Sequence, residues 1–145
     1  MPPVGYSGTP LARKLGLKAG QRVAVVRPPD HLEDLLRDRP EPLPLLRFST
    51  RGARYDQLLL FARDRRSLER DLPPAADRVD VDGSIWVCWP KKSSSLFRDL
   101  TEDGVREQVF PLALVDIKVC AVDADWSGLK VVYRKEERPR IRASR

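Results

Sequence analysis

Residues 83–95, GSIWVCWPKKSSS, decide the fold of this chain. Five consecutive apolar residues, 85–89, run directly into a proline, two lysines and three serines. An unbroken apolar run bounded by turn residues is typical of a strand that is buried on both faces. In open α/β sheets, ligands bind beyond the carboxyl ends of such strands. The stretch therefore predicts a central strand with Lys91 and Lys92 at the ligand-binding edge of a sheet.

Further strands and helices alternate on both sides of this stretch. Apolar runs predict strands over residues 22–26, 45–48, 55–62, 116–122 and 128–133. Helices are predicted over residues 11–15, 30–37, 64–72 and 99–110, with the N-cap candidates Thr9, Asp30, Asp64 and Asp99. Pro73 and Pro74 are expected to end the third helix. This order predicts an α/β fold: a Rossmann-like three-layer sandwich, with a mostly parallel sheet and a C-terminal antiparallel hairpin.

Length and charge suggest one domain with two short extensions. We expect an N-terminal arm over residues 1–10, a single Rossmann-like domain over 11–134 and a basic, disordered tail over 135–145. The chain carries 27 basic and 21 acidic residues, and residues 134–145 alone hold six basic and two acidic ones. The net charge of +6 therefore reports mainly the tail, and a basic folded face for nucleic acid is not required.

The two cysteines and the hydropathy of the chain both bear on where in the cell the protein is expected. Cys88 and Cys120 lie in apolar runs and are expected to be buried thiols, so no disulfide framework is predicted. No apolar stretch approaches the roughly 20 residues that cross a bilayer. The first residues also lack the apolar core of a signal peptide. We expect a soluble, cytoplasmic protein with no membrane partner.

Several segments resemble class I methyltransferases, which are Rossmann-like proteins with a reversed last strand. Residues 15–23, LGLKAGQRV, resemble the helix, turn and first strand of that family. Residues 55–60 resemble its fourth strand, 82–87 its fifth, and the segment closing in WSGLK, 126–130, its final hairpin. The resemblance implies the fold, with S-adenosylmethionine as the family's cofactor.

The loop after the first predicted strand departs from that family. Methyltransferases carry a glycine-rich loop there, because only glycine lets the backbone approach the cofactor closely. Here residues 26–30 read VRPPD, with no glycine and with two prolines that lack an N–H donor. An acidic residue to hold a ribose is also missing after the second strand, where residues 49–51 read STR. We therefore expect no cofactor bound in the usual manner.

A second resemblance covers more of the chain. Five strings are similar to a small bacterial family that is catalogued as domain of unknown function 3052: GYSGTPL at 5–11, WPKK at 89–92, DLTE at 99–102, VDIKVCAVD at 115–123 and WSGLK at 126–130. This resemblance implies no activity.

The loop after the central strand is the candidate ligand site. Serine hydroxyls, lysine ammonium groups and helix-start N–H groups all favour a phosphate or carboxylate. The candidate ligand-binding residues are Trp89, Lys91, Lys92, Ser93, Ser94 and Thr101, with Tyr6 and Thr9 from the arm. The alternative is a solvated loop beside a tryptophan that belongs to the core.

Metal and nucleophile chemistry have weaker support. His31 is the only histidine, and neither cysteine has a second ligand at metal-binding spacing, so no metal site is predicted. Asp123 and Asp125 are explained by a turn that their side chains stabilise. A Cys–His pair has no orienting signature, and no catalytic residue is assigned.

These observations favour a non-catalytic binding or regulatory module on a degenerate methyltransferase-like fold. It would have no cofactor and would bind a protein partner or a small anionic ligand. One alternative is an enzyme acting on a small anionic substrate, methyltransferase-like and with atypical cofactor binding. Another is weak nucleic-acid binding through the basic tail, weighed against a disordered solubilising end. The sequence alone assigns no specific activity.

Overall fold

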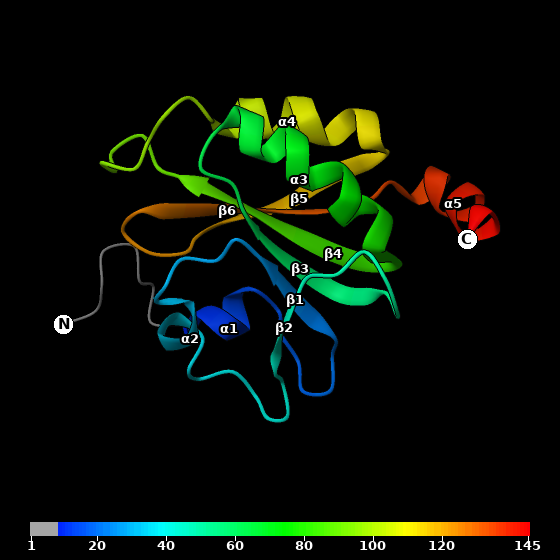
Figure 1. Cartoon of the computed structure of the whole chain (residues 1–145), viewed down its shortest axis with the longest axis horizontal. Helices are drawn as coiled ribbons and strands as arrows, with labels where there is room; N and C mark the ends of the chain where they lie inside the picture. Colours follow the sequence, from blue (N-terminus) through cyan, green and yellow to red (C-terminus); the bar gives the residue numbers. More distant parts are fainter. Residues whose placement is uncertain (1–8) are drawn as a thin grey trace.

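A six-stranded sheet forms the centre of the molecule. The computed structural model describes residues 9–145, so Tyr6 and most of the expected arm lie outside the described residues. The strands are β1 (Val23–Val26), β2 (Leu45–Arg47), β3 (Tyr55–Phe61), β4 (Val79–Pro90), β5 (Leu114–Ala121) and β6 (Trp126–Tyr133), in the order β2-β1-β3-β4-β6-β5. The first four are parallel, and β6 is antiparallel to both β4 and β5. The predicted Rossmann-like sheet with a closing hairpin is confirmed (Figure 1).

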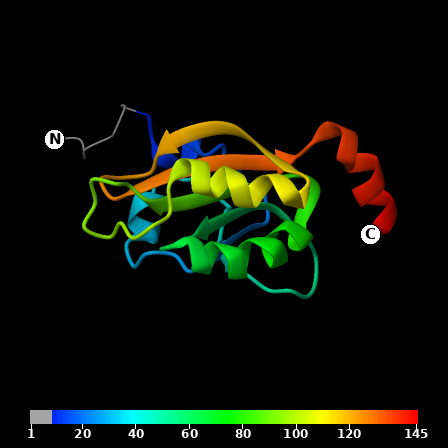
Figure 2. The same cartoon turned by 90° about the horizontal axis from the view of Figure 1, so that it is seen from above.

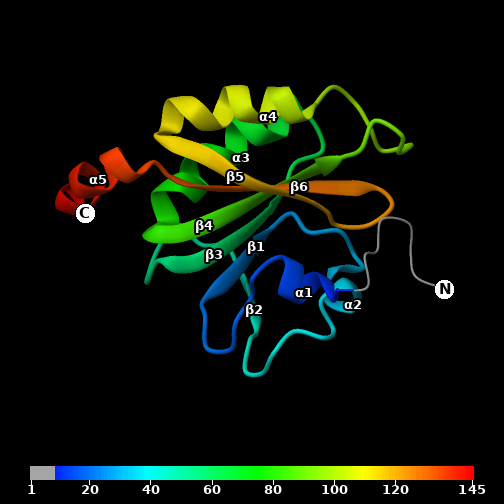
Figure 3. The same ribbon diagram turned by 180° about the vertical axis from the view of Figure 1, so that it is seen from behind.

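Helices cover both faces of the sheet. The α-helices are α1 (Leu11–Lys14), α2 (Leu32–Leu35), α3 (Arg65–Arg78), α4 (Glu102–Val109) and α5 (Arg138–Ser144), with short 3-10 turns at Phe110–Leu112 and Lys135–Glu137. Figures 1 and 3 show α3 and α4 on one side and the short α1 and α2 on the other. Seen from above in Figure 2, α5 projects beyond the end of the sheet.

The central strand β4 separates two apolar cores. Trp89 belongs to the core under α3 and α4, whereas Trp86 belongs to the core under α1 and α2. The expectation that the two indoles face opposite sides of the sheet is confirmed. The Trp86 Nε1–H donates a 2.9 Å hydrogen bond to the carbonyl of Leu15, so the buried indole is satisfied and fixed to the end of α1.

Strand β4 begins earlier than the apolar run predicts. Residues 79–82 alternate in burial, with Val79 and Val81 inside and Asp80 and Asp82 exposed, so this polar approach is itself a half-buried strand. A register shift follows, and a Cβ added at Gly83 would lie only 2.5 Å from the carbonyl oxygen of Asp56. The glycine lets two backbones approach closely at this irregularity.

Helix α3 also exceeds its prediction. It continues through Pro73 and Pro74 to Arg78, although each proline removes an N–H donor from the helix. Leu72, Ala75 and Ala76 are buried on either side of the two prolines. Packing of this face against the sheet therefore outweighs the lost hydrogen bonds.

Of the four N-cap candidates only Asp64 is confirmed, and α4 is capped by Thr101 in place of the predicted Asp99. Asp64 accepts a hydrogen bond from Ser67 N–H, and Thr101 accepts one from Gly104 N–H. In contrast, α1 follows Pro10 and α2 follows His31, neither with a side-chain cap, so Thr9 and Asp30 are not caps. Asp99 instead accepts from the Arg65 N–H, which joins the start of α3 to the loop before α4.

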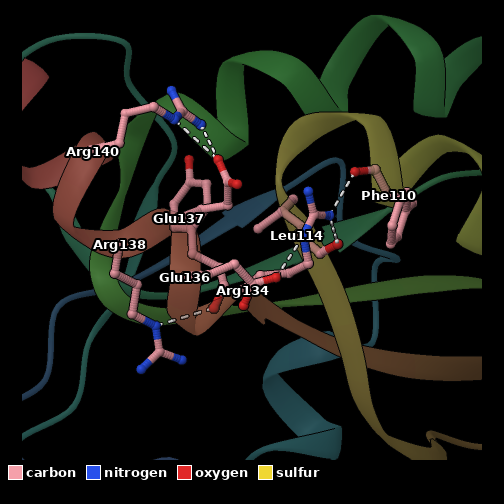
Figure 4. A network of polar contacts seen from close by, with 8 residues as sticks. Phe110, Leu114, Arg134, Glu136, Glu137, Arg138 and Arg140 are labelled. Atoms are coloured by element: carbon pink, nitrogen blue, oxygen red, sulfur yellow. Dashed lines mark hydrogen bonds and ion pairs between the residues drawn. The ribbon is translucent and has the colours of Figure 1, made fainter.

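The C-terminal residues differ from the disordered tail that was expected. Ile141 of α5 is buried in the core under α3 and α4. Arg134 donates to the carbonyls of Phe110 and Leu114, and its guanidinium lies 4.3 Å from the Phe110 ring centre (Figure 4). One apolar anchor and several arginine hydrogen bonds therefore attach the helix to the sheet, which the charge count does not reveal.

The structure also tests the expectations for the two cysteines and for membrane-spanning helices. Cys88 and Cys120 are free and buried, as predicted, and burial raises the pKa of both thiols. No helix in the described part of the chain combines the length and apolar character needed to span a membrane.

Candidate functional site

A cavity of about 520 Å³ opens at the carboxyl ends of the parallel strands. It is lined by the loops after β1, β3 and β4 and by the turn of the β5–β6 hairpin; the lining residues are Pro29, Asp30, His31, Arg63, Asp64, Leu96, Arg98, Asp125 and Trp126. Strand β1 connects to β2 on one side, whereas its neighbour β3 connects to β4 on the other. The cavity therefore lies at the topological switch point, where open α/β sheets bind ligands.

The loop after β1 contributes side chains rather than backbone donors. Arg27 has a φ of 49°, in the left-handed region that favours glycine. Its Nε donates to Asp71 Oδ2 on α3 at 2.8 Å, which fixes the loop against the helix. Pro28 and Pro29 follow and have no N–H, so Asp30 and His31 carry the polar groups that this loop offers.

The loop after β3 places a carboxylate and a guanidinium side by side. Asp64 is the N-cap of α3, and its Oδ1 accepts the Ser67 N–H at 2.8 Å. This backbone hydrogen bond is the main reason that the pKa of Asp64 lies below its ordinary value. Arg63 immediately precedes it and is exposed at the cavity.

The hairpin turn forms one wall of the cavity. Asp123 Oδ1 accepts the N–H groups of Asp125 and Trp126, both at 2.8 Å, which confirms that this aspartate belongs to a turn. Asp123 Oδ2 lies 2.7 Å from Nε2 of His31. Behind the turn, the Trp126 ring meets Phe61 edge to face, with 5.2 Å between the ring centres, so the wall is packed against β3.

The loop after β4 folds back onto this turn. The Lys91 N–H donates to the Asp125 carbonyl, and Ser94 Oγ donates to the Asp125 carboxylate, each at 2.8 Å. Lys92 and Ser93 are exposed. From this loop, Leu96 and Arg98 line the cavity.

Among the predicted ligand residues that the structure describes, those of the loop after β4 lie at this edge of the sheet, but none of the described ones lines its cavity. Trp89 lies in the core, and the Thr101 hydroxyl is engaged as a helix cap. Thr9 is partly buried just before α1. The lining of this cavity does not include Lys91, Lys92, Ser93 or Ser94, and their role as ligand contacts stays a prediction.

Sequence reasoning missed Arg63, Leu96 and Arg98. Arg63 directly follows the third strand, which was itself predicted, so its position was a usable signal. No local sequence pattern indicates that Leu96 and Arg98 lie at the cavity, because a chain reversal at residues 91–97 brings them there.

The cavity combines charges of both signs with apolar surface. Asp30, Asp64 and Asp125 supply carboxylates, and Arg63 and Arg98 supply guanidinium groups. Neither arginine has a carboxylate partner within ion-pair distance among residues 9–145. The same part of the chain holds no group of three metal-ligating side chains. Such a lining suits an amphoteric organic molecule.

Solved structures with a similar fold include several methyltransferases. An O-methyltransferase of neocarzinostatin biosynthesis, NcsB1, in complex with S-adenosylmethionine, is 14% identical with a TM-score of 0.64, over 90% of this chain and 54% of NcsB1. Magnesium protoporphyrin IX methyltransferase from Synechocystis PCC 6803 with bound SAM is 11% identical with a TM-score of 0.60, over 85% and 74% of the two chains. The DhpI–SAH complex is 10% identical with a TM-score of 0.57, over 89% and 85%. No family model and no curated protein sequence matches the chain.

These comparisons correct the prediction of a non-catalytic module. All three structures hold S-adenosylmethionine or SAH, and two of the three proteins are named as methyltransferases, which favours the enzyme alternative over a binding module. The cavity at the sheet edge forms without a glycine-rich loop, because residues 29–31 after β1 line it together with the loops after β3 and β4. The chain has the Rossmann-like fold of class I S-adenosylmethionine-dependent methyltransferases.

Proposed function

We propose that this chain is a methyltransferase-like enzyme that binds S-adenosylmethionine in the carboxyl-edge cavity and acts on a small anionic substrate. The observation that carries the proposal is the cavity itself, at the switch point between β1 and β3, in a fold shared with methyltransferases that hold this cofactor. When bound, the cofactor would supply an electrophilic methyl group on its sulfonium sulfur.

The side chains of the cavity fit the chemical groups of the cofactor. Its ammonium group and ribose hydroxyls need acceptors, which the carboxylates of Asp30 and Asp64 supply. Its carboxylate needs a cationic donor such as Arg63, and its base needs an apolar surface such as Leu96. Side chains from several loops would therefore replace the backbone donors of a glycine-rich loop.

Asp64 is the carboxylate best prepared for this role. Its Oδ1 is held by the Ser67 N–H at the first turn of α3. The backbone hydrogen bond lowers the pKa of Asp64, so the group is ionised at neutral pH. Asp64 would thus offer a fixed, charged acceptor at the start of α3.

The substrate class follows from the remaining cations. Arg63 and Arg98, two guanidinium groups without carboxylate partners, line one cavity. The single carboxylate of the cofactor would pair with one of them, which leaves the other guanidinium without an anion. A carboxylate or phosphate on the substrate would pair with the second.

The family assignment is part of the same proposal. The strings at 89–92 and 126–130 are similar to the family of domain of unknown function 3052. Both strings adjoin the cavity wall, since β6 begins at Trp126 beside the end of β4.

Calorimetric titration with S-adenosylmethionine and SAH tests the proposal. In thermal unfolding with either compound present at about 100 times its dissociation constant, the bound ligand should stabilise the fold by roughly 2.7 kcal/mol. Asp64→Asn keeps an N-cap residue and should fold, yet it should weaken binding at least tenfold. Asp103→Asn is the matched control, because its side chain is 89% exposed on α4 away from the cavity.

Two outcomes would contradict the proposal. Absence of binding of either compound to the folded wild-type chain would overturn cofactor binding. Equal weakening by Asp64→Asn and Asp103→Asn would overturn the assignment of the cavity. Transfer of a labelled methyl group to a panel of carboxylate and phosphate acceptors, reduced by Arg98→Gln, would then support the substrate class.

A further inference from the structure

A second cavity, of about 600 Å³, opens at the amino ends of the parallel strands. It is lined by the segment between α1 and β1, the first halves of β3 and β4, and the hairpin strands β5 and β6. The candidate active site lies at the carboxyl ends of the same parallel strands and shares no lining residue with it. We call this second cavity the amino-edge cavity.

Lys130 brings an ammonium group to the wall of this cavity. The residue is partly buried on β6, an inner strand of the sheet. It lies directly opposite Trp86 of β4, which belongs to the core under α1 and α2, so the lysine projects from that face of the sheet. Its Nζ reaches the turn after α1, because a Cβ added at Gly16 would lie 3.8 Å from it.

The charges nearest to Lys130 have the same sign. Lys118 lies directly opposite it on β5, and Lys18 lines the same cavity. Like charges on directly opposite residues destabilise a strand pair. No carboxylate of residues 9–145 lies within ion-pair distance of these three lysines. Burial, followed by the charges of Lys118 and Lys18, lowers the pKa of Lys130, and a bound anion would relieve both effects.

A chain of hydrogen-bonded amides presents a further donor at this wall. Gln57 is only 4% exposed, and its Nε2 donates to the Gly16 carbonyl and to Gln21 Oε1, both at 2.9 Å. The Lys18 N–H donates to the same Gln21 oxygen at 2.9 Å. Because this oxygen accepts two hydrogen bonds, the Gln21 amide offers its nitrogen, a donor, to a ligand in the cavity. The wall formed by α1 and β6 therefore suits a negatively charged group.

The first halves of β3 and β4 bring carboxylates to the same cavity. Asp82 is paired with Arg142 at 3.0 Å. Asp56 accepts the N–H of Arg22 at 2.7 Å, and Asp80 accepts the N–H of Asp82 at 3.1 Å. Among residues 9–145, no cationic side chain lies within ion-pair distance of Asp56 or Asp80. The cavity thus has cations without counter-ions on one side chain set and anions without counter-ions on another.

We propose that the amino-edge cavity binds a free α-amino acid, with the carboxylate at Lys130 and the ammonium group at Asp56 and Asp80. A zwitterion would neutralise both sets of side chains at once, which neither a simple anion nor a simple cation does. Hydrogen bonds between charged partners are also stronger than neutral ones. The volume of the cavity lies in the usual range for small-molecule sites. The site is independent of cofactor binding at the carboxyl edge.

Nuclear magnetic resonance on the full-length chain tests the proposal directly. The signal of the methylene group next to Lys130 Nζ is recorded while each standard amino acid is added in turn, with sodium chloride as the ionic control. We expect at least one amino acid to shift this signal saturably, and sodium chloride to leave it unchanged. Absence of a saturable shift with every standard amino acid would overturn the proposal.

Two analogues of the responding amino acid separate its two charges. Its primary amide keeps the ammonium group and lacks the carboxylate, whereas its N-acetyl derivative keeps the carboxylate and lacks the ammonium group. Each should bind at least about tenfold more weakly, because each loses one pair of charged hydrogen-bond partners. Undiminished binding of the N-acetyl derivative would identify a site for simple organic acids, and undiminished binding of the amide a site for simple cations. Either result would overturn the assignment of an amino acid.

Matched variants locate the binding. Lys130→Gln should weaken binding at least about tenfold. Lys135→Gln removes the same charge from an exposed position just before α5 and should bind as wild type does. Asp80→Asn keeps an acceptor for the Asp82 N–H and should also weaken binding, whereas Asp103→Asn on α4 should not. Equal effects within either pair would overturn the proposed contacts, and the analogue series on the wild-type chain does not depend on how any variant folds.

Discussion

His31 Nε2 and Asp123 Oδ2 lie 2.7 Å apart across the rim of the carboxyl-edge cavity, 92 residues apart in the sequence. The contact joins the loop after β1 to the β5–β6 turn. The side chain of His31 is 48% exposed and that of Asp123 only 13%, so the two partners contribute unequally. The exposed imidazole lies at the rim of the cavity, whereas the buried carboxylate accepts the backbone hydrogen bonds of the turn.

We expect Asp123→Ala to destabilise the fold by about 1–3 kcal/mol, because it leaves the N–H groups of Asp125 and Trp126 without their acceptor. His31→Ala should cost less than about 1 kcal/mol, as is usual for a polar contact at a solvent-exposed side chain. Urea unfolding of the variants measures both. Asp123→Asn keeps an acceptor and should recover part of the loss; if His31→Ala proved the more damaging change, the turn would not depend on Asp123.

Two glycine-to-alanine changes should have opposite effects. At Gly83 the new Cβ would lie 2.5 Å from the Asp56 carbonyl oxygen, which belongs to backbone and cannot move aside, so Gly83→Ala should destabilise by roughly 1–3 kcal/mol. At Gly104, within α4, the nearest atom would be Thr101 Oγ1 at 3.4 Å. There Gly104→Ala should stabilise by up to about 1 kcal/mol through helix propensity. Thermal unfolding decides both signs, and a harmless Gly83→Ala would mean that β3 and β4 can separate at this point.

The extent to which sequence predicts this fold depends on how local each signal is. The apolar run at 85–89 identified the central strand, since burial on both faces leaves a continuous pattern. Asp80 and Asp82 concealed the first half of the same strand, because only one side of it is buried there. Pro73 and Pro74 falsely indicated a helix end, since their local cost is offset by the packing of Leu72 and its neighbours.

The candidate site was harder to predict than the fold. A cavity does lie at the carboxyl end of β4, where the sequence predicted a site, but its wall includes Arg63, Leu96 and Trp126, three residues from different segments of the chain. No spacing along the chain relates them. The local departure at residues 26–30 was visible and favoured a non-catalytic module, whereas the side chains that we propose as cofactor contacts lie in other loops and gave no local signal.

The stability of the chain should fall in acid through two aspartates of α3 and its cap. A backbone hydrogen bond from Ser67 lowers the pKa of Asp64. Burial acts to raise the pKa of Asp71, but hydrogen bonds from Arg70 and Arg27 outweigh it, and the pKa lies below the ordinary 3.8. A carboxyl whose pKa is lower in the folded state contributes its full stabilisation above the unfolded pKa, and loses it as the pH falls through the folded value.

The test is a series of urea unfolding midpoints between pH 6 and pH 3. The wild-type midpoint should decline below about pH 4, and Asp71→Asn should flatten that decline while lowering the midpoint at pH 6. Arg27→Gln removes one of the hydrogen bonds and should flatten it partly. An Asp71→Asn curve parallel to the wild type at every pH would show that this carboxylate is not linked to folding.

Helix α5 should contribute to the stability of the whole domain. Ile141 is only 7% exposed, so Ile141→Ala should destabilise by about 2–4 kcal/mol through lost burial and the cavity left behind. Ile117→Ala is the matched control, since that side chain on β5 is 57% exposed and its loss should cost under about 1 kcal/mol. Urea unfolding followed by circular dichroism compares the two with a chain truncated after Tyr133, which should be at least as unstable as Ile141→Ala. If truncation left the unfolding midpoint unchanged, helix α5 would not contribute to the stability of the domain.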